Sequence, residues 1–176
     1  MSSITILGDT SGSVLLQAPA VAGSSTVTLP TTGGTIRTTT SAGTILQVIQ
    51  LPFPSNLVTT STSYVTTSVT LSITPSSANN KILISVNGGK TYSNTALMAC
   101  RMYRNGSDVF GANAQWTPFE GGGGSNHSFC YLDSPSTTST VTYTPYFRSH
   151  NGNSVYFTDS PATWGVVYMT AMEIAA

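Results

Sequence analysis

Apolar and polar residues alternate with a period of two along most of this 176-residue chain. Alternation of this kind puts every second side chain on the same face and is typical of half-buried β-strands, whereas an amphipathic helix repeats every three to four residues. The stretches "TILQVIQLPF", "KILISVNGG" and "STVTYTPYFRS" show it most clearly. About eight such strands, with no helix among them, predict an all-β fold, an antiparallel β-sandwich of the jelly-roll kind.

Breaks in the alternation predict where strands turn or end. The Asn-Gly pairs at 105–106 and 151–152 predict tight turns, the first of them inside "TALMACRMYRNGSDVF", which we expect to be a hairpin. The parity of the apolar positions shifts near Thr67, which predicts a bulge or a break there. The Asn-Gly-Gly run at 87–89 is expected to end a strand, and the four glycines at 121–124 to lie in a long loop.

The core of the sandwich should be formed by the apolar residues on the inward faces of these strands. Their side chains are large and mostly β-branched or aromatic, which suits packing between two pleated sheets. We expect the core to contain Ile45, Ile49, Ile82, Ile84, Val86, Phe129, Val141, Tyr143, Val155, Val167, Met169 and Met172.

The first part of the chain, residues 1–43, differs from the rest, residues 44–176, which we expect to form the sandwich domain. Its strands are very short, and Gly or Pro interrupts them repeatedly. It has too few large apolar groups to offset its own ordering entropy. It is therefore either a disordered tail or an extended β segment ordered by identical copies or by another protein. The alternation favours the second reading, and the side chains that would be buried in such an assembly are Val14, Leu16, Val27 and Leu29.

Composition strengthens the case for close packing between chains. Only 7% of residues are charged and the formal net charge is zero, while the sequence holds 25 Ser and 29 Thr. Few charges mean little electrostatic repulsion between identical chains lying side by side. The six basic residues are scattered, so no basic stripe for nucleic acid is expected. The start "MSSITILGD" does not resemble a signal peptide, and no apolar run is long enough to predict insertion into a membrane.

The two cysteines, Cys100 and Cys130, have neither the spacing of metal ligands nor that of a disulfide scaffold. Two reduced thiols on or near core faces are the main interpretation, because free cysteines are often buried. A disulfide between neighbouring strands remains the alternative.

Catalytic chemistry is not expected from this sequence. The acidic residues and histidines show no metal-ligand spacing, and the four glycines lack the Lys-Ser/Thr sequel of a phosphate loop. Glu120, His127 and Asp133 are the nearest to an acid–base set, but a solvated loop charge at Glu120 and a turn cap at Asp133 explain them as well. We predict no catalytic residues, no metal and no cofactor.

Aromatic residues around two loops, at 111–127 and 148–164, are the better candidates for recognition. Aromatic rings next to Asn, Ser and Gly can stack on sugar rings or on a partner protein. The alternative is that the two tryptophans close the ends of the sandwich or a seam between subunits. The residues proposed for a receptor or partner surface are Trp116, Phe119, His127, Tyr131, His150 and Trp164.

Two parts of the sequence resemble bacteriophage proteins. "GDTSGSVLLQAPAVAGSSTVTLPTTGGTI" resembles a segment that recurs in fibre and structural proteins of marine and cyanobacterial phages. "TSTSYVTTSVTLSITPSSANNKILISVNGG", "YLDSPSTTSTVTYTPYFRS" and the terminal "TAMEIAA" are similar to the C-terminal domain of phage tail-fibre-like proteins. Together the resemblances cover residues 4–36 and most of 44–176.

The resemblance implies a virion structural protein, assembled in the host cytoplasm, that forms a homotrimer and contacts other virion proteins through residues 1–43. A distal β-rich head would project from the particle, and its loops could bind a host cell-surface glycan or protein. Because the chain is short for a complete long tail fibre, the resemblance also allows a head fibre or a short tail component. The alternatives are a capsid cement or decoration protein, a monomeric lectin-like sandwich and, more remotely, a carbohydrate hydrolase using Glu120.

Overall fold

The computed structural model describes residues 3–7, 13–17, 42–53, 55–111, 114–118 and 123–176. By its internal packing the chain divides into two compact units, Met1–Ile36 and Arg37–Ala176. Val27 and Leu29, which were expected to lie in a short strand near the N-terminus, are outside the described residues.

The first unit contains a β-hairpin of two five-residue strands, β1 (Ser3–Leu7) and β2 (Ser13–Gln17). The strands pair antiparallel with Ile4 opposite Leu16 and Ile6 opposite Val14. The described apolar side chains of this hairpin are exposed, from 53% at Leu15 to 77% at Leu7. An isolated two-stranded hairpin is at best marginally stable in water, so these side chains lack the apolar cover that a stable hairpin needs.

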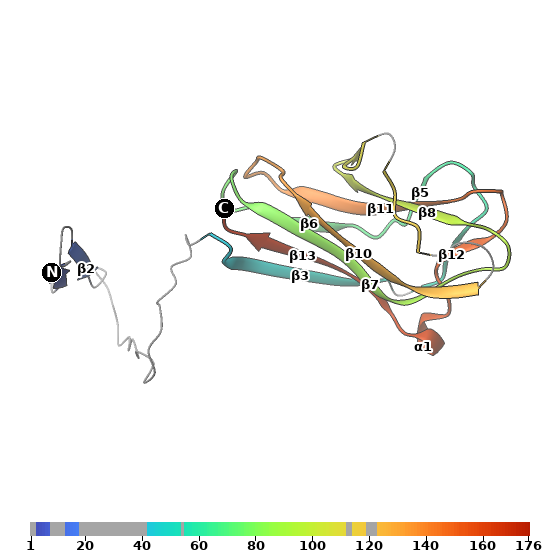
Figure 1. Ribbon diagram of the computed structural model, residues 1–176, viewed down its shortest axis with the longest axis horizontal. Coiled ribbons are helices and arrows are strands. Elements are labelled where there is room, and N and C mark those ends of the chain that lie inside the picture. The colour runs from blue at the N-terminus through green and yellow to red at the C-terminus, as the bar shows by residue number, and fades with distance from the viewer. Residues whose placement is uncertain (1–2, 8–12, 18–41, 54, 112–113, 119–122) are drawn as a thin grey trace. The chain divides into compact units, whose positions relative to one another are not determined.

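The second unit is built around two antiparallel sheets (Figure 1). In the first sheet the long strand β7 pairs with β10 on one side, and on the other with β13 along its first part and β12 along its last part. β3 then pairs with β13, and β4 pairs with β12. The strands of this sheet are β3 (Ile45–Phe53), β4 (Leu57–Thr59), β7 (Lys81–Ser93), β10 (Gly123–Asp133), β12 (Val155–Thr158) and β13 (Val167–Ile174).

The second sheet is centred on β11. On one side it pairs with β8, which in turn pairs with the short β9, and on the other side with β5 and β6 in succession. The strands of this sheet are β5 (Val65–Thr66), β6 (Leu71–Ile73), β8 (Met98–Arg104), β9 (Ser107–Asp108) and β11 (Val141–Ser149).

The order in which the chain visits the two sheets gives a jelly roll. If β3 with β4, β5 with β6, and β12 with β13 are each taken as one interrupted strand, eight strand paths remain. Numbered along the chain, the neighbouring paths in the first sheet are 1, 8, 3 and 6, and in the second sheet they are 2, 7, 4 and 5. This is the strand order of the eight-stranded, double Greek-key sandwich. The structure therefore confirms the predicted all-β fold.

The core lies between the two sheets, and eight of the twelve expected core residues are fully buried in it. Ile49 and Phe129 are partly buried and pack against the core. Ile45 is 55% exposed, so its assignment to the core was wrong. The assignment of Met172 was also wrong, because it is only partly buried and lies opposite Val48, which is 55% exposed, so it points to the outer face.

The breaks in alternation have different structural outcomes. β5 ends at Thr66 and β6 begins at Leu71, with Ser68 at φ 59°, so the predicted interruption near Thr67 is confirmed. The first Asn-Gly pair has φ angles of 50° and 81° and joins β8 to β9, as predicted. The run at 87–89, however, does not end a strand.

β7 continues through the Gly-Gly pair because this is where its neighbour changes from β13 to β12. Gly88 and Gly89 have φ angles of 87° and 57°, and a Cβ atom on Gly89 would lie 2.4 Å from Cγ2 of Val167. Two glycines therefore let the strand bend and shift its inward parity without a clash. Beyond the bend Thr91 and Ser93 face the core, and Lys90 and Tyr92 face outward.

Two further expectations about local structure need correction. The described part of the chain contains one helical turn, α1 (Pro161–Trp164), in the excursion between β12 and β13. The glycine run at 121–124 does not lie wholly in a loop, because β10 begins at Gly123. A Cβ on Gly124 would lie 2.6 Å from Cε of Lys90, so the absence of a side chain here lets the lysine lie across the neighbouring strand.

Candidate functional site

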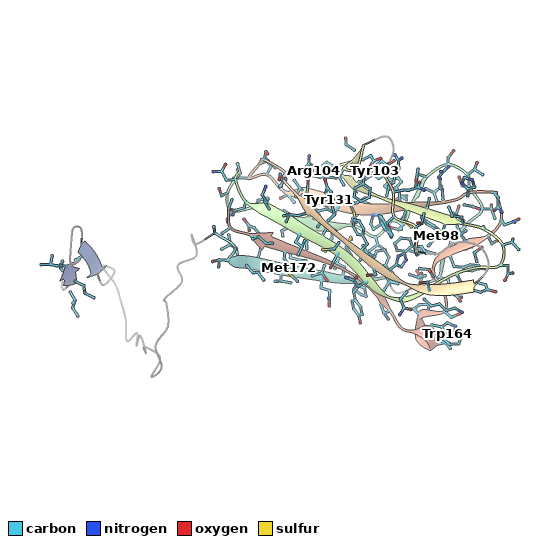
Figure 2. All side chains as sticks on the ribbon, viewed as in Figure 1. Met98, Tyr103, Arg104, Tyr131, Trp164 and Met172 are labelled. Atoms are coloured by element: carbon cyan, nitrogen blue, oxygen red, sulfur yellow. The ribbon has the colours of Figure 1, made fainter. Side chains whose placement is uncertain are left out.

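An outward-facing group on the first sheet brings together Lys90, Tyr92, Tyr156 and Trp164. We call these four residues the aromatic platform. Nζ of Lys90 lies 4.4 Å from the ring centroid of Trp164 and 4.7 Å from that of Tyr92. The rings of Tyr92 and Tyr156 are 6.0 Å apart and tilted by 52°. Trp164 is 56% exposed on α1, at the outside of the sheet (Figure 2).

A cavity of about 280 Å³ adjoins the platform at the end of the sandwich. Its walls are the two tyrosines together with neutral polar residues from the β7–β8 and β11–β12 connections. Asn153 donates its side-chain amide to Oγ1 of Thr95 across 2.9 Å, which holds the two connections together. The residues that line the cavity are Tyr92, Asn94, Thr95, Asn153, Ser154 and Tyr156.

Trp116 and Tyr131 lie in a different place, at the open edge between β9 and β10. Trp116 stacks on Phe129 with ring centroids 4.3 Å apart, and its backbone bridges to Cys100 of β8. Phe110 meets the ring of Tyr131 edge-on at 5.1 Å, and the Tyr131 hydroxyl donates to the carbonyl of Val109. This cluster closes the edge of the sandwich. For Trp116 the structure therefore agrees with the alternative interpretation, in which the tryptophans close the sandwich.

The remaining residues of the predicted surface are dispersed. His127 is only 2% exposed, and Nε2 lies 2.8 Å from the carbonyl oxygen of Phe157. His150 is exposed, and its backbone N–H donates to the carbonyl of Leu97. Phe119 lies outside the described residues. Trp164 is thus the one member of the predicted set that belongs to the platform.

The buried position of His127 governs its ionisation. Burial lowers the pKa of its imidazole to about 4, although the hydrogen bond to the Phe157 carbonyl acts in the opposite direction. Because a carbonyl oxygen only accepts, the proton of the neutral ring is on Nε2, and Nδ1 is buried without a hydrogen-bond partner among the described residues. The residue is therefore a neutral part of the interior.

The acid–base set considered from the sequence does not come together. His127 and Asp133 both lie in β10, and at roughly 3.3 Å per residue their six-residue separation places them about 20 Å apart. Asp133 accepts two hydrogen bonds from Nη1 of Arg104, at 2.9 and 2.7 Å, and a third from the Tyr143 hydroxyl at 2.6 Å. It is a buried ion-pair partner and not a turn cap. Glu120 lies outside the described residues.

A second buried carboxylate, Glu173, is held by neutral donors. Its Oε1 accepts from the backbone N–H and hydroxyl of Ser76 and from the side-chain amide of Asn80, and its Oε2 accepts from Gln47. Burial alone would raise the pKa of this carboxyl, but the hydrogen bonds outweigh it and leave the pKa below its ordinary value. The arrangement fastens the β6–β7 connection and β3 to the last strand.

An apolar row crosses the outer face of the first sheet at directly paired positions. Val48 pairs with Met172, Met172 with Leu83, and Leu83 with Leu132. Paired residues share a face, and Val48 and Leu132 are 55% and 49% exposed. Met172 lies on this side of the sheet (Figure 2). We call Val48, Met172, Leu83 and Leu132 the apolar row.

The surroundings of the apolar row are almost free of charge. The next row on the same face consists of neutral polar residues and Cys130, and the row beyond contains Tyr168, which is 42% exposed. None of the described residues in these three rows carries an ionic side chain. On β7 the nearest lysines are Lys81, at the start of the strand, and Lys90, beyond the Gly-Gly bend. An apolar, uncharged set of rows of this kind suits packing against another protein surface.

The two cysteines do not form a disulfide. Cys100 is buried on the inward face of β8, and burial raises the pKa of its thiol well above the ordinary value. Cys130 is exposed on the outward face of β10, in the other sheet. Both thiols are free, as the main interpretation of the sequence expected, but only Cys100 lies on a core face, so that interpretation was wrong about the position of Cys130.

Sequence reasoning missed three of the four platform residues. Lys90 and Tyr92 follow the Gly-Gly pair that was expected to end β7, so their outward position depends on a bend that the pattern did not predict. Tyr156 alternates with the buried Val155 and Phe157, which is a readable signal of an outward side chain. Among the described residues no cluster of three or more candidate metal ligands occurs, and no helix there is long and apolar enough to cross a membrane.

Comparisons with known proteins give a likeness at the level of structure only. No family model and no curated protein sequence matches the chain. A VP2 subviral particle of infectious bursal disease virus has 10% identity and a TM-score of 0.48, over 92% of this chain and 42% of that one. The T13 particle of the same virus gives 12% and 0.41, over 94% and 42%, and its Gt strain 13% and 0.37, over 97% and 46%. This chain spans less than half of each of these proteins.

Proposed function

We propose that this protein is a structural component of a bacteriophage particle, a short fibre-like homotrimer whose jelly-roll head projects outward. One observation carries the proposal: the chain exposes apolar β surface in both of its units. This surface has no role in a chain that remains alone, but it is what an assembling chain needs. The resemblance of both parts of the sequence to phage fibre proteins supplies the kind of assembly.

The hairpin of the first unit supports an attachment role for residues 1–43. Ile4, Ile6, Leu7 and Leu15 are 66%, 55%, 77% and 53% exposed. Burying side chains of this size stabilises by about 1.5–3 kcal/mol each, and two short strands cannot provide that cover themselves. Copies of the hairpin, or another virion protein, would provide it.

The apolar row supports contact between heads. Second copies are the best-fitting occupants, because the apolar row and the two rows beside it carry no ionic side chain among the described residues. They offer no charge pattern to a charged partner and little repulsion against a copy of themselves. Three heads related by a threefold axis would bury the rows near that axis and leave the loops at 148–164 pointing to solvent. The loops at 148–164 would then be free to meet a host surface, and the same role for residues 111–127 stays a prediction from the sequence.

A capsid cement protein is the second candidate, and the uncharged outer face favours it equally. Such a protein would use this face to bind capsomers instead of its own copies. The two functions differ in copy number, since a fibre is present in few copies and a cement covers the whole shell. Jelly rolls occur in viral coat domains and in lectins, which agrees with either by analogy of fold.

Quantitative mass spectrometry of purified phage particles tests the proposal. We expect the chain in the particles, at a few trimers per particle relative to the major capsid protein. A copy number close to that of the capsid protein would support the cement function instead. Absence of the chain from washed, infectious particles would contradict both.

A further inference from the structure

We propose that the aromatic platform and its adjoining cavity bind a neutral oligosaccharide. This inference rests on the proposed function, in which the head meets a host surface, and it names the site and the chemical class of the ligand. The platform lies on the outward face of the first sheet, at the end of the sandwich. Its residues on β7 follow the Gly-Gly bend, whereas Leu83 of the apolar row precedes that bend, so the two surfaces are separate.

The platform offers rings to the apolar faces of sugars. The rings of Tyr92 and Tyr156 lie 6.0 Å apart, and the ammonium of Lys90 covers one face of the Trp164 and Tyr92 rings at 4.4 and 4.7 Å. The faces that the ammonium does not cover are the ones a sugar would stack on. The C–H bonds of a pyranose ring carry partial positive charge and pack well on the electron-rich face of an aromatic ring. Three aromatic rings around one lysine suit a ligand of several sugar units.

The cavity offers the hydrogen-bonding groups that sugar hydroxyls need. Its lining contains two amides and two hydroxyls besides the tyrosines, all neutral. Among the described residues the amide nitrogen of Asn94 and the hydroxyl of Tyr156 have no hydrogen-bond partner, so both are free to bind a ligand. With about 280 Å³, the cavity is at the small end of ligand sites, of a size for part of an oligosaccharide.

The electrostatics favour a neutral ligand over an acidic one. Lys90 forms a salt bridge of 3.1 Å with Asp159, so the one cation of the platform is already neutralised. Among the described residues, no charged side chain lines the cavity. An acidic sugar would meet no free cation there and would lose hydration of its carboxylate without compensation.

Trp164 lies in a turn that backbone hydrogen bonds hold in place, so its exposure is a fixed feature of the fold. The backbone N–H of Asp159 donates to the carbonyl of Lys90 across 2.8 Å, and that of Ser160 donates to the side chain of Asn56 across 2.7 Å. Ser160 has a φ of 43°, a left-handed conformation that is unfavourable for a residue other than glycine. Strain of this kind persists only where the surroundings enforce it, and it often accompanies ligand sites.

An array of neutral and acidic oligosaccharides probed with the full-length protein tests the proposal. We expect binding to neutral glycans, and Trp164→Ala and Tyr156→Ala to weaken it at least tenfold. The control is Tyr146→Ala, which removes an aromatic residue from the outer face of the other sheet, where it stacks on Tyr103. This variant should bind as the unchanged protein does. Circular dichroism and sedimentation of each variant report whether fold and assembly are kept.

Three outcomes would overturn the inference. These are no glycan bound by an assembled protein, equal loss in the Tyr146→Ala control, and binding confined to acidic glycans or to a host protein. None of them affects the proposed function, which depends on the presence of the chain in particles. Conversely, glycan binding by a protein absent from particles would contradict the proposed function and leave the binding site intact.

Discussion

The side-chain amide of Asn80 donates a hydrogen bond of 2.6 Å to Oε1 of Glu173, joining the β6–β7 connection to the last strand. Asn80 also accepts, at its Oδ1, the backbone N–H of Ala176 at 3.3 Å. Both side chains are buried, Glu173 to 1% exposure. Asn80 thus joins Ser76 and Gln47 in holding the last strand to the end of the sandwich.

Replacing Asn80 by Ala should destabilise the sandwich by about 2 kcal/mol, because a buried carboxylate loses one of its hydrogen bonds. The matched control is Asn79→Ala, since Asn79 is exposed in the same connection and its side chain makes no hydrogen bond to Glu173. That change should stay within about 0.5 kcal/mol. Urea denaturation measures both, and equal effects of the two variants would contradict the role given to Asn80.

The free energy of unfolding should fall in mild acid because His127 is protonated on unfolding. Its folded-state pKa of about 4 lies below the ordinary value of 6.5, so the unfolded chain takes up a proton that the folded chain does not. The stability contributed by the neutral ring is complete above pH 6.5 and is lost as the pH falls toward 4, by up to about 1.4 kcal/mol per pH unit.

Calorimetry between pH 4 and 7 checks this dependence, with His127→Gln as the variant that cannot titrate. The variant should show a clearly shallower fall of the melting temperature across that range. Glu173, whose pKa is lowered, contributes its own loss only below about its ordinary value of 4.5, so the two effects occupy different windows. The same slope in both proteins would rule out His127 as the cause.

Gly89→Ala should be among the most damaging single changes in β7. The new Cβ would lie 2.4 Å from Cγ2 and 2.9 Å from the backbone nitrogen of Val167, in addition to the cost of a positive φ. We expect a loss of about 3 kcal/mol or more, from overpacking and backbone strain together. Gly106→Ala is the control, because Gly106 has a φ of 81° with open space around it and should lose only about 1 kcal/mol. Thermal unfolding compares the two, and similar losses would mean that the close approach to Val167 is not limiting.

Thiol labelling should distinguish the free chain from the assembled one. Cys130 lies on the same outer face as Leu132, so we expect slow reaction with a maleimide in the assembled protein and fast reaction after dilution. Cys100 should react only on unfolding, because its thiol is buried and its pKa is raised. Cys130→Ser serves as the control and should leave no rapidly reacting thiol. If the labelling rate of Cys130 does not change with protein concentration, this face is not part of the interface.

The sandwich could be predicted from the sequence because period-two alternation and Asn-Gly turns are local signals. Alternation correctly marked the inward residues of β7 before its bend and of β11, and the pair at 105–106 marked a hairpin. Met172 was misassigned although alternation alone rules out its sharing a face with Met169. Ile45 was misassigned because it lies beyond a bulge between β3 and β13, which shifts the register at the end of the pair.

The aromatic platform was less accessible to sequence reasoning, because it depends on long-range pairing. The Gly-Gly bend in β7 exists to accommodate β13 and the excursion that follows β12, more than 70 positions later in the chain. The bend turns Lys90 outward to meet Trp164. Single-sequence patterns identify Trp164 as a candidate, but they cannot show which aromatic residues become its neighbours.

Sedimentation of the full-length protein over a wide concentration range tests the central claim, that the exposed apolar faces serve assembly. We predict a mass of three times the 18.3 kDa chain, and a shift toward the single-chain mass when Val48 and Leu132 are both replaced by Glu. Replacing Thr142 and Thr144 by Glu, which adds the same two charges to the outer face of the other sheet, should keep the trimer. A single-chain mass at the highest concentration, or a trimer that survives both substitutions in the apolar row, would contradict the claim.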